Sequence, residues 1–100
     1  MTLQEIKAAQ AAGATGEETL RALDAYIAAH NSDDEALTER GMLNWAMNRR
    51  SAAINDYLAA VRLNPRSRAG QALKAAYDIL NFYNKDSTTR NQPRAESRER

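Results

Sequence analysis

The stretch from residue 34 to residue 67 constrains the fold of this chain more than any other part. It contains two segments of similar length with helical spacing of apolar residues, separated by a short basic turn over residues 48–50. The second segment stops at Asn64 and Pro65. Proline cannot continue the helix before it, because its ring lacks an N–H donor and clashes with the preceding turn. We therefore expect two helices that are joined by a tight turn and lie antiparallel.

Small and aromatic residues stand at particular positions in this expected hairpin. Gly41, Ala53 and Ala60 let two helices approach closely, and Tyr57 can fill the space beside them. Together with Pro65, these residues resemble the signature of the tetratricopeptide repeat, a helical hairpin of about 34 residues. The resemblance implies a short right-handed α-solenoid of about two and a half repeats, with first helices lining a concave groove and second helices forming the convex back.

The apolar spacing also predicts which sides of the two helices meet. Leu37, Gly41 and Asn44 should face the second helix of the hairpin, whereas Asp56 should lie toward solvent. Arg40 stands where the family usually has leucine, so we expect it to be partly exposed or paired with an acid.

Residues 2–31 are expected to form a first hairpin, and residues 33–65 a second one. Capping boxes begin at Thr2, Thr15 and Ser32, each with a glutamate three positions later. In such a box the two side chains satisfy free amides of the first helical turn, so each box predicts the start of a helix.

Residues 67–84 are expected to form a fifth helix with one broad apolar face, which covers the last complete hairpin. The whole of residues 1–84 is thus predicted to be one all-α domain of antiparallel helical hairpins. From residue 85 onwards the chain contains Pro93 and no large apolar residue. That composition predicts a disordered polar tail over residues 85–100, with a linker or a segment that orders on a partner as the alternatives.

Charge and composition narrow the function. The chain has 14 Lys and Arg residues against 13 Asp and Glu, a balance that does not favour nucleic acid or an anionic membrane as partner. It has no cysteine and one histidine, so we predict no metal site and no cofactor. No arrangement of nucleophile and base is visible, which predicts that the chain is not an enzyme. No signal peptide or membrane segment is visible either, so the cytoplasm is the default location.

The resemblance implies that one side of the first helix in residues 33–65 faces a groove. Trp45 on that side is a typical binding anchor, although packing is the commoner role of a large aromatic residue. A subclass of the family grips a terminal carboxylate with charged or amide residues at two positions occupied here by Thr38 and Met42, so that subclass is disfavoured. The candidates for partner binding are Glu35, Thr38, Met42, Trp45, Ala46 and Arg49.

Four arginines in the expected turns are a further candidate feature. Arg49 and Arg50 should come near the same edge of the stack as Arg66 and Arg68 and form a small basic rim, with solvated turn charge as the alternative reading.

These patterns predict a non-catalytic module that binds a peptide or a partner protein through its concave face. The alternative is self-association through the fifth helix, because Ile79 and Phe82 add apolar surface outside its main stripe. Under these two hypotheses the chain is expected to be a monomer or a weak homodimer, respectively. Nucleic-acid binding by the basic turns and the tail is the weakest hypothesis. The candidates for self-association are Ile79, Leu80, Phe82 and Tyr83.

Overall fold

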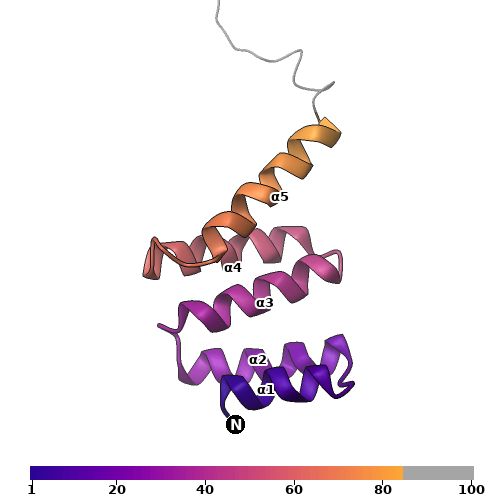
Figure 1. The fold of residues 1–100 in the computed structure, drawn as a ribbon, viewed down its shortest axis with the longest axis vertical. Coiled ribbons are helices and arrows are strands. Elements are labelled where there is room, and N and C mark those ends of the chain that lie inside the picture. Colours follow the sequence, from indigo (N-terminus) through magenta and orange to yellow (C-terminus); the bar gives the residue numbers. More distant parts are fainter. Residues whose placement is uncertain (85–100) are drawn as a thin grey trace, which may run out of the picture.

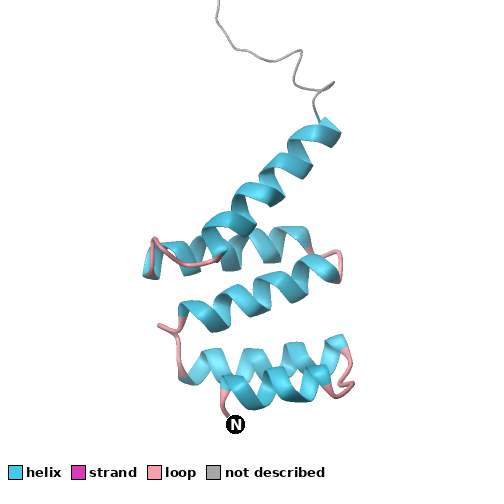
Figure 2. Cartoon of the chain, viewed as in Figure 1, coloured by secondary structure: helices cyan, strands magenta, loops and turns pink. Residues whose placement is uncertain are grey.

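The computed structural model describes residues 1–84, with side chains as far as Phe82. This described part is all-α and contains no strand (Figure 2). The predicted tail of residues 85–100 and the side chain of Tyr83 lie outside the described residues. The helices are α1 (Leu3–Ala11), α2 (Gly16–Ala29), α3 (Asp34–Ala46), α4 (Arg50–Leu63) and α5 (Ala69–Asn84).

Each helix packs against the next one along the chain, so that α1 contacts α2, α2 contacts α3, α3 contacts α4 and α4 contacts α5. The result is an elongated stack of 55 × 26 × 18 Å. Figure 1 shows α5 at one end of this stack, inclined to α4 and away from the first hairpin. Because neighbours in sequence are neighbours in space, α5 packs against other helices of residues 1–84 on one side only.

Two of the three predicted capping boxes are confirmed, those at Thr2 and Thr15. At the start of α2, Thr15 Oγ1 accepts a hydrogen bond from the backbone N–H of Glu18 at 3.1 Å, and Glu18 Oε1 accepts one from the N–H of Thr15 at 2.9 Å. These hydrogen bonds lower the pKa of Glu18, because they favour its charged form.

The third box is wrong, because Asp33 and not Ser32 caps α3. Asp33 Oδ1 accepts a hydrogen bond from the N–H of Ala36 at 3.1 Å. Its other oxygen accepts a hydrogen bond from the Tyr26 hydroxyl at 2.9 Å, which raises the pKa of Tyr26. One aspartate therefore caps α3 and ties its start to the end of α2.

The close approach of α3 and α4 follows from small residues, as the sequence predicts. A Cβ atom at Gly41 would lie 2.6 Å from the Tyr57 ring and 3.2 Å from the carbonyl oxygen of Ala53. Ala53 and Ala60 are fully buried. Any side chain at position 41 must push the two helices apart, since contacts under 3 Å are repulsive.

The prediction that Asp56 faces solvent is wrong. Asp56 is only 6% exposed, and it lies against two polar side chains of α3. Arg40 donates to it from Nε at 3.1 Å and from Nη2 at 2.8 Å, while Asn44 Nδ2 donates at 3.0 Å. The expectation that Arg40 is paired is confirmed, and these hydrogen bonds to Asp56 raise the pKa of Arg40. Arg40 also bonds Asp24 of α2 at 3.0 Å, which links three helices.

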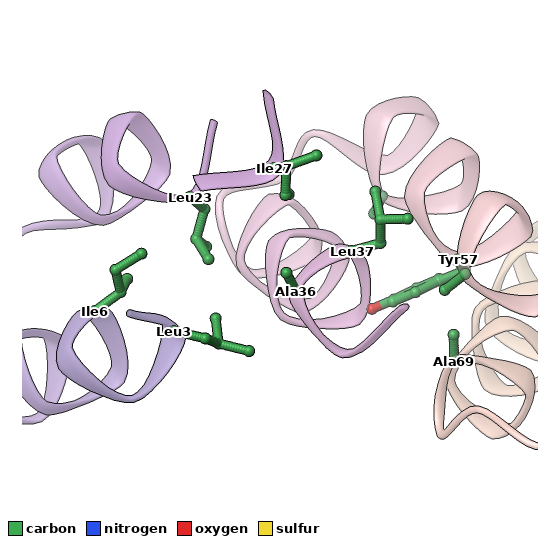
Figure 3. Packing of buried hydrophobic residues seen from close by; sticks show 10 residues of the cluster. Leu3, Ile6, Leu23, Ile27, Ala36, Leu37, Tyr57 and Ala69 are labelled. Carbon is green, nitrogen blue, oxygen red and sulfur yellow. The ribbon is translucent and has the colours of Figure 1, made fainter. Parts of the chain in front are cut away.

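The apolar core runs through the stack from α1 to α5. Figure 3 shows Leu3 and Ile6 of α1 near Leu23 of α2, and the Tyr57 ring extending from α4 towards α3. This continuous core joins both hairpins and the start of α5. Its buried apolar members are Leu3, Ile6, Leu23, Ile27, Ala36, Leu37, Ala53, Tyr57, Ala60 and Ala69.

Candidate functional site

An apolar depression lies between α3 and α5, with α4 beneath it. Its volume is about 260 Å³, and two of its lining residues are buried, Tyr57 of α4 and Ala76 of α5. Met42 of α3 is 44% exposed and Ile79 of α5 is 38% exposed. Large apolar side chains that remain this exposed are candidates for contact with a partner when they gather in one place. The lining residues are Met42, Trp45, Tyr57, Ala72, Ala75, Ala76 and Ile79.

Only some of the predicted groove residues line the depression. Met42 and Trp45 line the depression, whereas Ala46 is exposed on the same helix without lining it. Glu35 is half-buried and pairs with Arg68 in the turn before α5. The depression therefore begins beyond the first turns of α3.

Thr38 is not available to a partner in this structure, contrary to the prediction that it faces a groove. It is fully buried. Its hydroxyl donates to the carbonyl oxygen of Asp34 at 2.8 Å and lies 3.1 Å from the hydroxyl of Ser67. The turn that leads into α5 therefore covers this part of α3. Ser67 Oγ also accepts a hydrogen bond from the N–H of Ala69 at 3.1 Å, which ties this turn to the start of α5.

Ion pairs cross the stack beside the depression. Glu39 of α3 lies 3.5 Å from Lys7 Nζ of α1 and 2.9 Å from Arg68 Nη2. Arg68 also contacts Glu35, and these hydrogen bonds to two carboxylates raise the pKa of Arg68. Each charge in this strip therefore has a partner of opposite sign, so the strip itself presents little net charge.

The prediction of one basic rim is wrong in its geometry. Arg49 ends the turn between α3 and α4 and Arg50 begins α4, whereas Arg66 and Arg68 lie in the turn between α4 and α5. These two turns stand at opposite ends of α4, roughly 20 Å apart for a helix of that length. Arg49 pairs with Glu17 of α2 at 2.8 Å. The four arginines thus belong to separate surroundings.

Arg50 stacks on Trp45, a contact that the sequence analysis did not predict. The guanidinium carbon lies 4.8 Å from the centre of the indole ring, which is within the range of a cation–π interaction. The Nε atom of Arg50 is buried and has no hydrogen-bond partner among residues 1–84. Since Trp45 also lines the depression, this cation stands next to its apolar wall.

A signal in the sequence could have found the α5 side of the depression. Ala72, Ala76 and Ile79 stand 34 positions after Thr38, Met42 and Trp45. Adding the predicted interval of 34 residues to three expected groove positions of α3 therefore gives three residues of α5 that line the depression.

The fifth helix has further exposed apolar side chains. Tyr77 and Phe82 are exposed, and Leu80 is half-buried. Of the predicted self-association residues, Ile79 belongs to the depression, whereas Leu80 and Phe82 do not line it.

A second, polar depression of about 390 Å³ lies where α2, α3 and α4 meet. Its charged groups include Asp24, Arg40, Arg49 and Asp56, and each of these already bonds a residue of opposite charge. The apolar depression remains the better candidate for a binding site.

Residues 1–84 contain neither a candidate metal site nor a candidate membrane span. No cluster of histidine and acidic side chains there has the composition of a metal site. The helices in that part of the chain are too short or too polar to span a membrane. No protein-family model, curated protein or solved structure matches the chain.

Proposed function

We propose that this chain is a non-catalytic protein-interaction module of the tetratricopeptide-repeat type, which binds a peptide or a partner protein in the depression between α3 and α5. The observation that carries the proposal is the gathering of Met42, Trp45 and Ile79 around one apolar depression on two neighbouring helices. The repetition of lining positions at an interval of 34 residues, together with the packing of each helix on the next, supports the solenoid arrangement.

The size of the depression suits a side chain better than a free metabolite. Its volume of about 260 Å³ exceeds the roughly 150 Å³ of an apolar cavity that accommodates benzene, so it can take one large apolar side chain. Burying such a side chain contributes about 1.5–3 kcal/mol, which a partner segment can supplement with backbone and rim contacts. Tryptophan and arginine, both present here, are frequent centres of binding energy at interfaces.

The test uses a displayed library of tryptophan-free dodecapeptides selected on the purified chain. Binding of the selected peptides is measured by the fluorescence of Trp45, which is the only tryptophan. Met42→Glu places a charge in the depression and is expected to weaken binding at least about tenfold. Ala46→Glu is the matched control, because Ala46 is exposed on the same helix outside the depression.

Equal effects of these two substitutions would contradict the proposed site. Failure to select any peptide would contradict the proposed function itself. Circular dichroism of both variants checks that each retains the helix content of the parent chain.

A second candidate function is self-association through α5. The observation that favours it is the exposure of Tyr77 and Ile79 on the same helix, both of them large and apolar. Light scattering coupled to size exclusion across a wide concentration range is the measurement. A dimer that Tyr77→Asp converts to a monomer would support this candidate, whereas a monomer at every concentration would eliminate it.

A further inference from the structure

Arg50 differs from the cations that form ion pairs across the helical stack, and also from Arg21, Arg62 and Arg66, which form no ion pair within residues 1–84 but are exposed. Lys7, Arg40, Arg49 and Arg68 each contact at least one carboxylate. Arg50 takes part in no ion pair within residues 1–84, and its Nε atom is buried without a hydrogen-bond partner. A buried donor that has lost water and gained no acceptor is unfavourable, and the guanidinium charge of Arg50 is not compensated by any carboxylate of residues 1–84.

The surroundings of Arg50 add to its positive potential. Arg50 is the first residue of α4, and the side chain of the preceding Arg49 makes no capping hydrogen bond. The first turn of α4 has no acidic residue, whereas α1, α2 and α3 each have at least one there. The amino end of a helix carries a partial positive charge, which therefore has the same sign as the guanidinium and is not offset by a local carboxylate.

Trp45 connects this cation to the apolar depression. Its ring lines the depression and also contacts the Arg50 guanidinium, at 4.8 Å from the ring centre. Stacking restricts the orientation of the guanidinium and so reduces the entropy that it loses on pairing. A group that reaches the Trp45 end of the depression consequently meets a positive charge directly after an apolar wall.

We infer that the partner segment carries an Asp or Glu side chain beside its apolar anchor, and that Arg50 binds this carboxylate while the anchor occupies the depression between α3 and α5. The inference rests on the proposed function, because it concerns the same depression. The occupant is thus an acidic peptide segment, chosen by the charge that the site leaves unmatched. Arginine pairs with a carboxylate through two parallel N–H···O bonds, and such charge-assisted bonds are stronger than neutral ones. Binding of a carboxylate by Arg50 also differs from the terminal-carboxylate grip of the repeat subclass. Two positions that the subclass uses for that grip are occupied here by Thr38 and Met42, which carry no charge.

The experiment begins with the same peptide selection on the full chain and then compares matched peptides. The selected sequences are expected to show Asp or Glu at a constant distance from a large apolar residue. For one such peptide, replacing the acid by its amide should weaken binding to the parent chain about tenfold, as expected for a charge-assisted hydrogen bond.

Three variants assign this preference to Arg50. In Arg50→Gln the acidic peptide and its amide should bind with affinities within about twofold of each other. In Arg49→Gln the preference for the acid should remain, because Arg49 already pairs with Glu17. Arg50→Glu should reverse the preference, so that a lysine-containing version of the peptide binds better than the acidic one. Circular dichroism and thermal unfolding of each variant establish that it is folded, and the reversal provides a gain of binding that a misfolded chain would not give.

The outcomes separate this inference from the proposed function. Enrichment of apolar residues without acids, or an acid preference that persists in Arg50→Gln, would overturn the inference and leave the proposed function standing. A selection that enriches no peptide would overturn both. Dimerisation of the parent chain that Arg50→Gln abolishes would identify a second copy as the occupant and would overturn the assignment of a separate acidic partner.

Discussion

The two helices that border the depression, α3 and α5, differ in how deeply they bury residues that stand 34 positions apart. Both pack on α4, but α3 lies between α2 and α4, whereas α5 stands at the end of the described stack (Figure 1). Three pairs of residues that stand 34 positions apart in the two helices differ in burial. Leu37, Gly41 and Asn44 of α3 are buried, while Gln71, Ala75 and Asp78 of α5 are exposed.

The residue types match these surroundings. On α3 these positions hold the apolar Leu37, Gly41 without a side chain, and Asn44, whose amide donates a hydrogen bond to the buried Asp56. On α5 the corresponding residues are Gln71, Ala75 and Asp78, and Asp78 pairs with Lys74 on the exposed surface. A helix inside a stack must be complementary to the next helix, whereas a terminal helix can present polar groups to water. The difference indicates that α5 ends the stack within residues 1–84.

The largest expected effect tests the close packing of α3. Gly41→Ala places a methyl group 2.6 Å from the Tyr57 ring and should lower the free energy of unfolding by about 2 kcal/mol, a typical cost of overpacking. Ala75→Leu, the corresponding position on α5, adds more atoms but should change it by less than about 0.5 kcal/mol. Urea unfolding followed by circular dichroism measures both. Equal losses would show that α5 is packed as tightly as α3 on this side.

A smaller effect on stability is expected from substitutions at two aspartates, the buried Asp56 of α4 and the exposed Asp78 of α5. Asp56→Asn removes the charge that receives hydrogen bonds from Arg40 and Asn44, and should cost about 1–2 kcal/mol because the amide oxygen still accepts one bond. Asp78→Asn breaks an exposed pair with Lys74, at 3.2 Å, and should cost less than about 0.5 kcal/mol. Unfolding at low and high salt distinguishes them further, since salt screens the exposed pair more strongly.

Local pattern and packing geometry account for what the sequence predicted correctly. The helices follow from apolar spacing and from the capping boxes at Thr2 and Thr15, which act within one helical turn. The approach of α3 and α4 follows from Gly41 and Ala53, because small residues allow it whatever the neighbours are. The apolar side of the candidate site was predictable in the same way, through Met42 and Trp45.

Two of the errors concern side chains whose surroundings depend on a distant partner. Asp56 was expected outside because an acidic residue on an amphipathic helix usually faces water, but Arg40 and Asn44, 16 and 12 positions away, supply its hydrogen bonds. Thr38 is buried because Ser67, 29 positions later, folds over it. The stacking of Arg50 on Trp45 depends on the conformation of the turn between them, where Asn48 has a φ of 64°. Such pairings are not encoded in the spacing of residue types along one helix.

The smallest predicted effect compares a buried tyrosine in the interior of the stack with an exposed one on α5. Tyr57 is 4% exposed, and burial raises its pKa above the ordinary value of 10.0. In the unfolded chain the hydroxyl ionises near that ordinary value, so above it the unfolded state loses its proton first and gains stability relative to the folded state. The stability that a neutral Tyr57 provides is therefore complete below pH 10 and is lost as the pH rises through the raised pKa. Tyr57→Phe should reduce the alkaline loss of stability, leaving the part that comes from Tyr26, whose pKa is raised by Asp33. Tyr77→Phe is the matched control on α5, because it removes the same hydroxyl group from a ring that is 44% exposed. Urea unfolding at a series of alkaline pH values measures both variants. An equal change in both variants would mean that the two tyrosines share the same surroundings, and the contrast between the interior and the end of the stack would fail at this position.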